Sequence, residues 1–140
     1  MARRLLVPLD GSSPSQEALR YALDTFPDAK IVLVHVLTPV DGNVGPDGLL
    51  GDPAGVVDDQ RNRAEELFDE AAATAGDDHE IERELLAGRP ATEIVGCVEE
   101  YDIDQIVMGS HGRDGAARLL LGSVSETVVR RSPVPVTVVR

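Results

Sequence analysis

Cysteine, aromatic residues and lysine are scarce in this sequence, and each shortage excludes a class of protein. The single cysteine, Cys97, rules out an internal disulfide, and no cysteine–histidine spacing typical of a zinc site occurs. Aromatic residues make up 3% of the chain, so its core must consist of Val, Leu, Ile and Ala. No apolar run approaches the roughly 18 residues of a membrane-spanning helix, and the first residues lack the apolar region of a signal peptide. We therefore expect a cytoplasmic protein without a membrane partner.

Basic residues are also few, and Lys30 is the only lysine. Lys and Arg together number 13 against 25 Asp and Glu, which gives a formal net charge of -12. This excludes nucleic acid as a partner, because no basic surface is available to neutralise its phosphates. An acid excess with so little lysine predicts a halophile with a salt-rich cytoplasm, where salt screens the self-repulsion of the chain. An ordinary acidic cytosolic protein remains the alternative.

Strand and helix patterns alternate along the 140 residues, which we take as one domain over residues 1–140. Apolar, β-branched segments predict five strands at residues 4–9, 30–37, 79–87, 104–108 and 134–139. Apolar residues at helical spacing predict four helices near residues 13–26, 56–75, 90–101 and 123–131. The alternation predicts a doubly wound, open parallel sheet with helices on both faces. We expect Ser13 to cap the first helix and Ser123, with Glu126, to cap the last.

Two loops that follow predicted strands carry the residues typical of a binding site. One runs from Asp10 to Ser13, and the other runs from Gly109 to Ser123. Ligands of open parallel sheets bind at the carboxyl ends of the strands, where the strand order reverses. If both loops contribute to one site, strands one and four must be neighbours. The predicted order is therefore 3-2-1-4-5, and not the flavodoxin-like 2-1-3-4-5.

The second loop has the spacing Gly109-x2-Gly112-x9-Gly122-Ser123, between an apolar strand and a helix. Glycines let a backbone approach a phosphate closely, and the N–H groups and dipole of a helix start favour its charge. The sequence contains neither a Walker A lysine motif nor G-x-G-x-x-G, so the standard P-loop and dinucleotide-binding sites are excluded. The pattern predicts a phosphate site of another kind. Arg113 lies in this loop, either in contact with phosphate or as a solvated charge.

The predicted order leaves the fifth strand at an edge of the sheet. Pro135 agrees with an edge, because proline cannot donate to a central ladder. The strand, with Val134 and Val139 at its ends, is otherwise an apolar edge without charged residues to prevent pairing. We therefore expect a homodimer that pairs this strand with its copy in a second chain.

These motifs resemble the universal stress protein family, specifically its ATP-binding branch. The resemblance rests on the glycine motif, on the opening Leu6-Val7-Pro8-Leu9-Asp10-Gly11-Ser12 and on the closing Ser132-Pro133-Val134-Pro135-Val136. It covers essentially the whole chain and implies the doubly wound fold with a dimer through the last strand. It also implies ATP, or AMP or ADP, as the ligand, together with Mg²⁺.

The resemblance assigns roles to individual residues. Pro8, Leu9 and Asp10 match the turn that meets the adenosine, with Asp10 near the ribose or the metal. Val36 matches the position whose backbone reads adenine. Two residues match the floor beneath the ribose: Met108 and Gly109. Five match the phosphate cradle or an added hydroxyl: Gly112, Gly122, Ser123, Val124 and Ser125.

The sequence favours a regulatory ATP-binding protein of the stress response over an enzyme. No Ser–His–Asp set or other catalytic partner is evident. We expect His35 and His79 to be structural or exposed, and Cys97 to have a packing role. A slow ATPase or phosphoryl-transfer enzyme remains an alternative, as does an interaction module with an AMP-binding or vestigial pocket. An unknown protein partner is compatible with each. The long loop over residues 38–55 is interpreted either as a lid or as a tolerated insertion.

Overall fold

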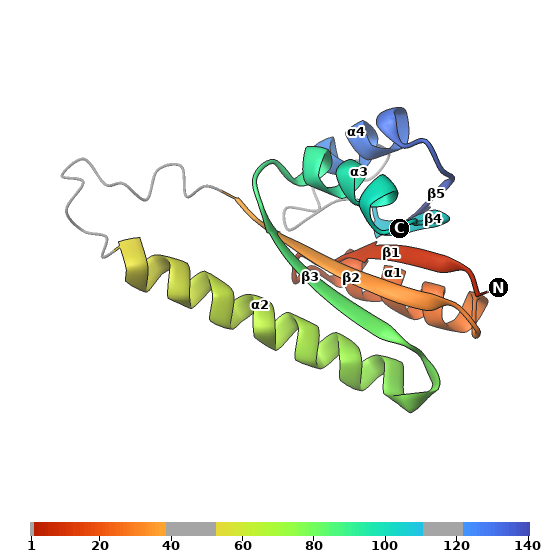
Figure 1. Ribbon diagram of the computed structural model, residues 1–140, viewed down its shortest axis with the longest axis horizontal. Coiled ribbons are helices and arrows are strands. Elements are labelled where there is room, and N and C mark those ends of the chain that lie inside the picture. The colour runs from red at the N-terminus through yellow and green to blue at the C-terminus, as the bar shows by residue number, and fades with distance from the viewer. Residues whose placement is uncertain (1, 39–52, 111–121) are drawn as a thin grey trace.

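A single parallel sheet forms the centre of the molecule, which we describe from a computed structural model (Figure 1). The structure describes residues 2–38, 53–110 and 122–140. The strand order is β3-β2-β1-β4-β5, which confirms the predicted order 3-2-1-4-5. The described strands are β1 (Arg4–Pro8), β2 (Lys30–Leu37), β3 (Ile81–Ala87), β4 (Gln105–Gly109) and β5 (Val136–Val139).

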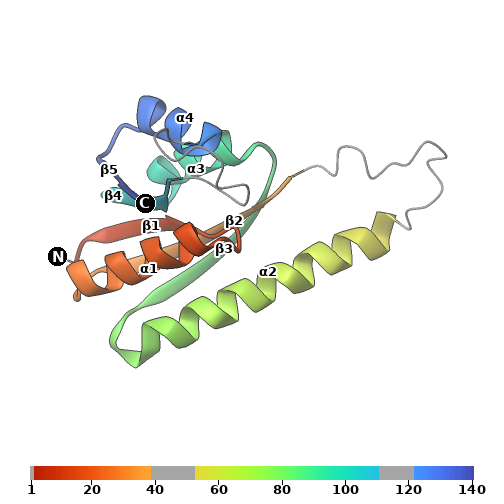
Figure 2. The same cartoon turned by 180° about the vertical axis from the view of Figure 1, so that it is seen from behind.

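Helices cover both faces of this sheet, as the alternating sequence pattern predicts. The described helices are α1 (Ser13–Thr25), α2 (Pro53–Ala75), α3 (Pro90–Glu100) and α4 (Ser123–Arg131), with a short 3-10 turn at Gly76–Asp78. Helices α1 and α2 lie on one face, and α3 and α4 lie on the other (Figures 1 and 2). The architecture is thus a three-layered α/β fold, a class in which ligands bind at the carboxyl ends of the strands.

Strand β2 explains why continuous apolar runs form the middle layer. Ile31 and Leu33 join the core beneath α1 and α2, whereas Val32 and Val34 join the core beneath α3 and α4. Successive side chains of a strand point to opposite faces, and both faces here are covered by helices. A strand in this position therefore has no solvent-facing side on which a polar residue would be favoured.

The two predicted helix caps are wrong by one residue. Ser12, not Ser13, caps α1, and its hydroxyl oxygen accepts a hydrogen bond from the Ser15 amide at 3.3 Å. Gly122, not Ser123, is the cap of α4, and it supplies no side-chain hydrogen bond. In each case the last residue with an extended backbone comes one position earlier than the sequence pattern predicted. Ser13 and Ser123 are therefore already helical.

Helix α2 begins at Pro53, three residues before the predicted start at residue 56. Proline is favoured in the first turn of a helix, where its missing N–H would have no partner. The predicted long loop over residues 38–55 is therefore shorter than expected at this end. Its residues 39–52 lie outside the described residues, and so does the predicted lid.

Strand β5 lies at the edge of the sheet, as predicted, but it begins at Val136. Pro135 precedes the strand, and its carbonyl accepts a hydrogen bond from the Ile106 amide at 3.0 Å. Proline thus contributes an acceptor to the ladder but has no N–H to donate, so regular pairing begins at the next residue. The predicted strand of residues 134–139 was two residues too long for this reason.

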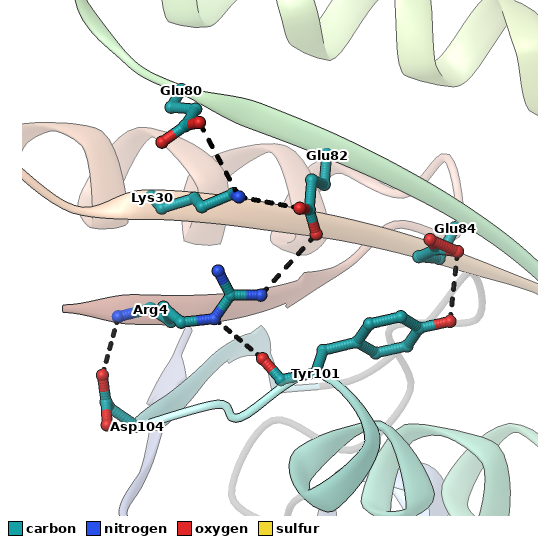
Figure 3. Close-up of polar contacts among 7 residues, drawn as sticks. All are labelled: Arg4, Lys30, Glu80, Glu82, Glu84, Tyr101 and Asp104. Carbon is teal, nitrogen blue, oxygen red and sulfur yellow. Dashed lines mark hydrogen bonds and ion pairs between the residues drawn. The ribbon is translucent and has the colours of Figure 1, made fainter. Parts of the chain in front are cut away.

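A charged network joins the strands at their amino ends (Figure 3). The Nζ atom of Lys30 lies 2.7 Å from a carboxylate oxygen of Glu82, and Arg4 contacts the other oxygen at 3.7 Å. Arg4 also donates its Nε–H to the carbonyl of Tyr101 and its main-chain N–H to the carboxylate of Asp104. The network therefore connects β1, β2 and β3 with the segment that leads into β4.

Among the residues placed in the structure, no helix is long and apolar enough to cross a membrane.

Candidate functional site

A cavity of about 1020 Å³ opens at the carboxyl ends of β2, β1 and β4. It is large compared with typical small-molecule sites, which occupy about 300–1,000 Å³. All the predicted site residues within the described part of the chain line it: Pro8, Leu9, Asp10, Val36, Met108, Gly109, Gly122, Ser123, Val124 and Ser125. The other two predicted positions, Gly112 and Arg113, lie outside the described residues.

The turn after β1 orients the carboxylate of Asp10. Its Oδ1 atom accepts hydrogen bonds from the amide of Ser12, at 2.9 Å, and from the Ser12 hydroxyl. Gly11 enables this tight turn with a φ of 83°, a conformation that other residues rarely adopt. No hydrogen bond from a described residue reaches Oδ2, so one oxygen of the fixed carboxylate is available to a ligand.

The end of β2 presents main-chain groups to the cavity. The amide of Leu9 donates to the carbonyl of Val34 at 2.8 Å, and the pairing of β1 with β2 stops at Pro8 and Val34. Because strand residues alternate, the N–H and C=O of Val36 point toward the same side as those of Val34. Beyond the end of β1 they have no main-chain partner among the described residues.

His35 ends this ladder. Its Nδ1 atom lies 2.6 Å from the carbonyl oxygen of Leu9, the acceptor that continued pairing would offer to the amide of Val36. The imidazole thus takes the next position in the ladder, and the backbone of Val36 remains open. We predicted His35 to be structural or exposed, and the structure places it in the cavity wall.

The first turn of α4 forms the other end of the cavity. The Gly122 amide donates to the Ser110 carbonyl at 2.6 Å, and the Ser125 hydroxyl donates to the same carbonyl at 2.6 Å. Ser125 also lies 3.1 Å from the Gly122 carbonyl, and it is 2% exposed. Its hydroxyl proton is therefore used to fix the helix start to the end of β4. The initial amides of α4 have no side-chain cap, which leaves them available to an anion.

Helix α2 contributes residues that the sequence did not assign to a site. Gln60, Arg63, Leu67 and Glu70 line the cavity, and their spacing places them on one helical face. The adjacent face packs into the core through Ala64, Phe68 and other residues. The sequence signal was a polar stripe beside the apolar stripe, but a solvent-exposed face produces the same pattern.

Two further sequence predictions concern residues outside the cavity lining. Cys97 is buried in the core at 1% exposure, which confirms the packing role. His79 was predicted to be structural or exposed, and both of its ring nitrogens are buried without a hydrogen-bond partner among the described residues. Within the described ranges no cluster of three or more His, Cys, Asp or Glu side chains is arranged to hold a metal ion.

Comparison with known proteins agrees with this geometry. The family model described as "Universal stress protein family" matches residues 1–140. A universal stress protein of Thermus aquaticus is 35% identical, with both chains covered completely. Universal stress protein MJ0531 of Methanocaldococcus jannaschii is 32% identical over 99% of this chain and 82% of its own length.

Solved structures share the fold as well. The structure of the protein MJ0577 has a TM-score of 0.84 and 26% identity, and the match covers 99% of this chain and 96% of that one. A universal stress protein in complex with cAMP has a TM-score of 0.66 and 26% identity, over 99% and 97% of the two chains. Together with the strand order and the site at the β1 and β4 ends, these matches show that the chain belongs to the universal stress protein family.

Proposed function

We propose that this protein binds ATP, or AMP or ADP, as a regulatory protein of the stress response, in a single domain spanning residues 1–140. The observation that carries the proposal is one cavity that joins the open backbone of Val36 to the uncapped start of α4. The first suits a nucleobase and the second suits phosphate. The relative in complex with cAMP supports a nucleotide as the ligand.

The strand order sets the direction of the ligand. Neighbouring strands lie about 4.8 Å apart, so β4 and β2, with β1 between them, are separated by roughly 10 Å. A nucleotide with its phosphates at α4 therefore extends past β1 and brings its base to the end of β2. There the N–H and C=O of Val36 match the acceptor and donor on the Watson–Crick edge of adenine.

The phosphates would bind at Gly122, Ser123 and Val124, where the first amides of α4 carry the positive end of the helix dipole. Such a local field is needed because the chain carries a net charge of -12. Gly112 and Arg113 are proposed to complete the phosphate site. The floor beneath the ribose is proposed at two residues of the lining, Met108 and Gly109.

Mg²⁺ fits this arrangement through Asp10. Proteins commonly hold this ion with one or two carboxylates while phosphates and water supply the remaining ligands. The free Oδ2 of Asp10 offers one such oxygen, and the Ser12 contacts keep it in place. Mg²⁺ would neutralise part of the phosphate charge at the site.

Binding is favoured over turnover, because the Ser125 hydroxyl and Oδ1 of Asp10 are used in hydrogen bonds that shape the site, and Oδ2 of Asp10 is assigned to the metal. A slow ATPase remains the alternative function. Activity that scales with protein concentration and disappears in Asp10→Ala would support it.

The test of binding is calorimetry with ATP and AMP on the wild type and Gly122→Val. The φ of Gly122, -66°, suits any residue, so the variant removes room at the phosphate without straining the backbone. We expect the affinity to fall at least tenfold. Gly96→Val on α3 is a matched control, since its Cβ would meet nothing within 4 Å. Equal nucleotide affinity of Gly122→Val and the control would refute the site. If denatured wild type releases no nucleotide and the folded protein binds none in calorimetry, an interaction module is favoured instead.

We also propose a homodimer through β5. The alternation of the ladder points the N–H and C=O of Val138 away from β4, toward the open edge. Val138→Pro therefore removes an outward donor and leaves the β4 pairing in place. Light scattering at micromolar concentration should give a dimer for the wild type and a monomer for the variant. A monomeric wild type would contradict the proposal.

A further inference from the structure

We propose that the Nε2 atom of His35 accepts a hydrogen bond from the 6-amino group of a bound adenine, so that His35 selects 6-aminopurine nucleotides. The inference rests on the proposed nucleotide function and adds a residue that determines its base specificity. It follows from three observations: the partner of Nδ1, the strand position of His35 and its place in the cavity wall.

The partner of Nδ1 fixes the tautomer of the ring. A carbonyl oxygen can only accept a hydrogen bond, so the 2.6 Å contact with Leu9 requires the proton to be on Nδ1. In the neutral imidazole the other nitrogen, Nε2, is then an acceptor. No described residue supplies a donor to it. His35 thus offers the cavity one oriented acceptor.

The strand position places this acceptor at the base end of the site. His35 follows the buried Val34 and precedes Val36, whose open N–H and C=O suit the edge of a base. Phosphates held at α4 put the base about two strand spacings away, which is the end of β2. The imidazole is therefore beside the base, two strands away from the phosphates.

The chemistry of an acceptor gives the selectivity. The 6-amino group of adenine has two N–H bonds, and one can donate to Nε2 while the other faces the carbonyl of Val36. A purine without a 6-substituent leaves Nε2 unpaired, and a 6-oxo purine sets two acceptors against each other. An unmade hydrogen bond at an enclosed polar site is what discriminates strongly between similar ligands.

The experiment compares AMP with purine riboside 5′-monophosphate, which lacks only the 6-amino group. Calorimetry gives both affinities for the wild type, His35→Asn and His35→Gln. The Asn amide nitrogen occupies the position of Nδ1, so it can keep the bond to Leu9 but has no acceptor at the Nε2 position. The Gln side chain reaches the Nε2 position, where its oxygen can accept.

We expect the preference of the wild type for AMP to shrink about two- to tenfold in His35→Asn, the range of one net hydrogen bond, and to persist in His35→Gln. An equal loss for both ligands in His35→Asn would overturn the inference, as would no change. dAMP, which lacks the 2′-hydroxyl of the ribose, is a further control ligand. If His35→Asn weakens the binding of AMP but not of dAMP, the acceptor contacts the ribose hydroxyl, and this result also overturns the inference. If wild type binds neither ligand, the proposed function itself fails.

A measurement on the wild type covers the case in which the variants do not fold. Nitrogen-15 spectra of the imidazole should show a protonated Nδ1 and an unprotonated Nε2 for His35. Adding AMP should shift the Nε2 resonance toward the values of a hydrogen-bonded acceptor, whereas purine riboside 5′-monophosphate should not. The same spectrum with both ligands would refute the contact.

Discussion

Gly109, the last residue of β4, lies directly against Pro14 in the first turn of α1. A Cβ atom built at Gly109 would lie 2.7 Å from both the carbonyl carbon and the Cβ of Pro14. Neither atom belongs to a flexible side chain, so neither can move aside without the helix. The glycine that the sequence suggested for ligand approach is thus also required for the packing of α1 on the sheet.

Gly109→Ala is expected to destabilise the protein by about 1–3 kcal/mol, the usual cost of overpacking a tight core contact. Urea unfolding followed by circular dichroism measures the change in the free energy of unfolding. A variant as stable as the wild type would show that α1 can shift away from β4 at little cost.

Gly96→Ala is expected to have the opposite effect. Gly96 lies within α3, and a Cβ there would meet nothing within 4 Å. Alanine favours the helix by about 0.5–1 kcal/mol, chiefly because glycine loses more backbone freedom on folding. The same unfolding experiment should show a higher midpoint, and a lower midpoint would mean that α3 has a neighbour at this position.

Glu82 should make stability depend on acid pH. The hydrogen bond from Lys30 holds the pKa of Glu82 below its usual range, with a further contribution from the charges of Lys30 and Arg4. A carboxyl group with a lowered pKa in the folded state stabilises the fold above its ordinary pKa of about 4.3, and this contribution is lost as the pH falls below that value. Wild type should exceed Glu82→Gln in stability by up to about 1 kcal/mol at pH 6, since the pair is partly exposed, and the difference should be smaller at pH 3.

Glu80→Gln is the control for this experiment. Glu80 reaches the same lysine at 3.7 Å, but its side chain is 73% exposed. We expect little change at either pH. An equal effect of both substitutions would indicate that general charge, not the Lys30 contact, governs the pH dependence.

Cys97 should resist thiol reagents in the folded protein. Burial, with smaller contributions from the carboxylates of Glu100, Glu93 and Glu84, raises the pKa of its thiol to about 11. The thiolate is the reactive form, so a disulfide reagent at pH 8 should label the protein only after denaturation. Rapid labelling under native conditions would reveal local opening of α3.

The order of the strands could be predicted because two loops needed to share one site. Asp10 follows β1 and Gly109 ends β4, and only the adjacency of these two strands brings them together. The exact helix starts could not be predicted in this way. Whether Ser12 or Ser13 caps α1 depends on one extended residue, and neighbouring serines give the same sequence signal.

The lining of the cavity was predicted along the strand ends and missed on the side of α2. Arg63 and Gln60 reach the cavity because α2 packs beside the sheet, a tertiary relationship without a local sequence signal. His35 was not predicted to line the cavity, because a histidine within an apolar strand is usually structural, and its contact with the Leu9 carbonyl depends on the tertiary structure. The prediction of a salt-rich cytoplasm remains to be tested by measuring stability against salt.

The central place of β1 also affects how the chain folds during synthesis. Leu5 pairs on one side with Ile31, which follows soon after it, and on the other side with Gln105, which the ribosome produces much later. Until then one edge of this central strand has no partner and can pair with another chain. Long-range pairing of this kind slows folding, so we expect the nascent protein to depend on protection until its last third has been made.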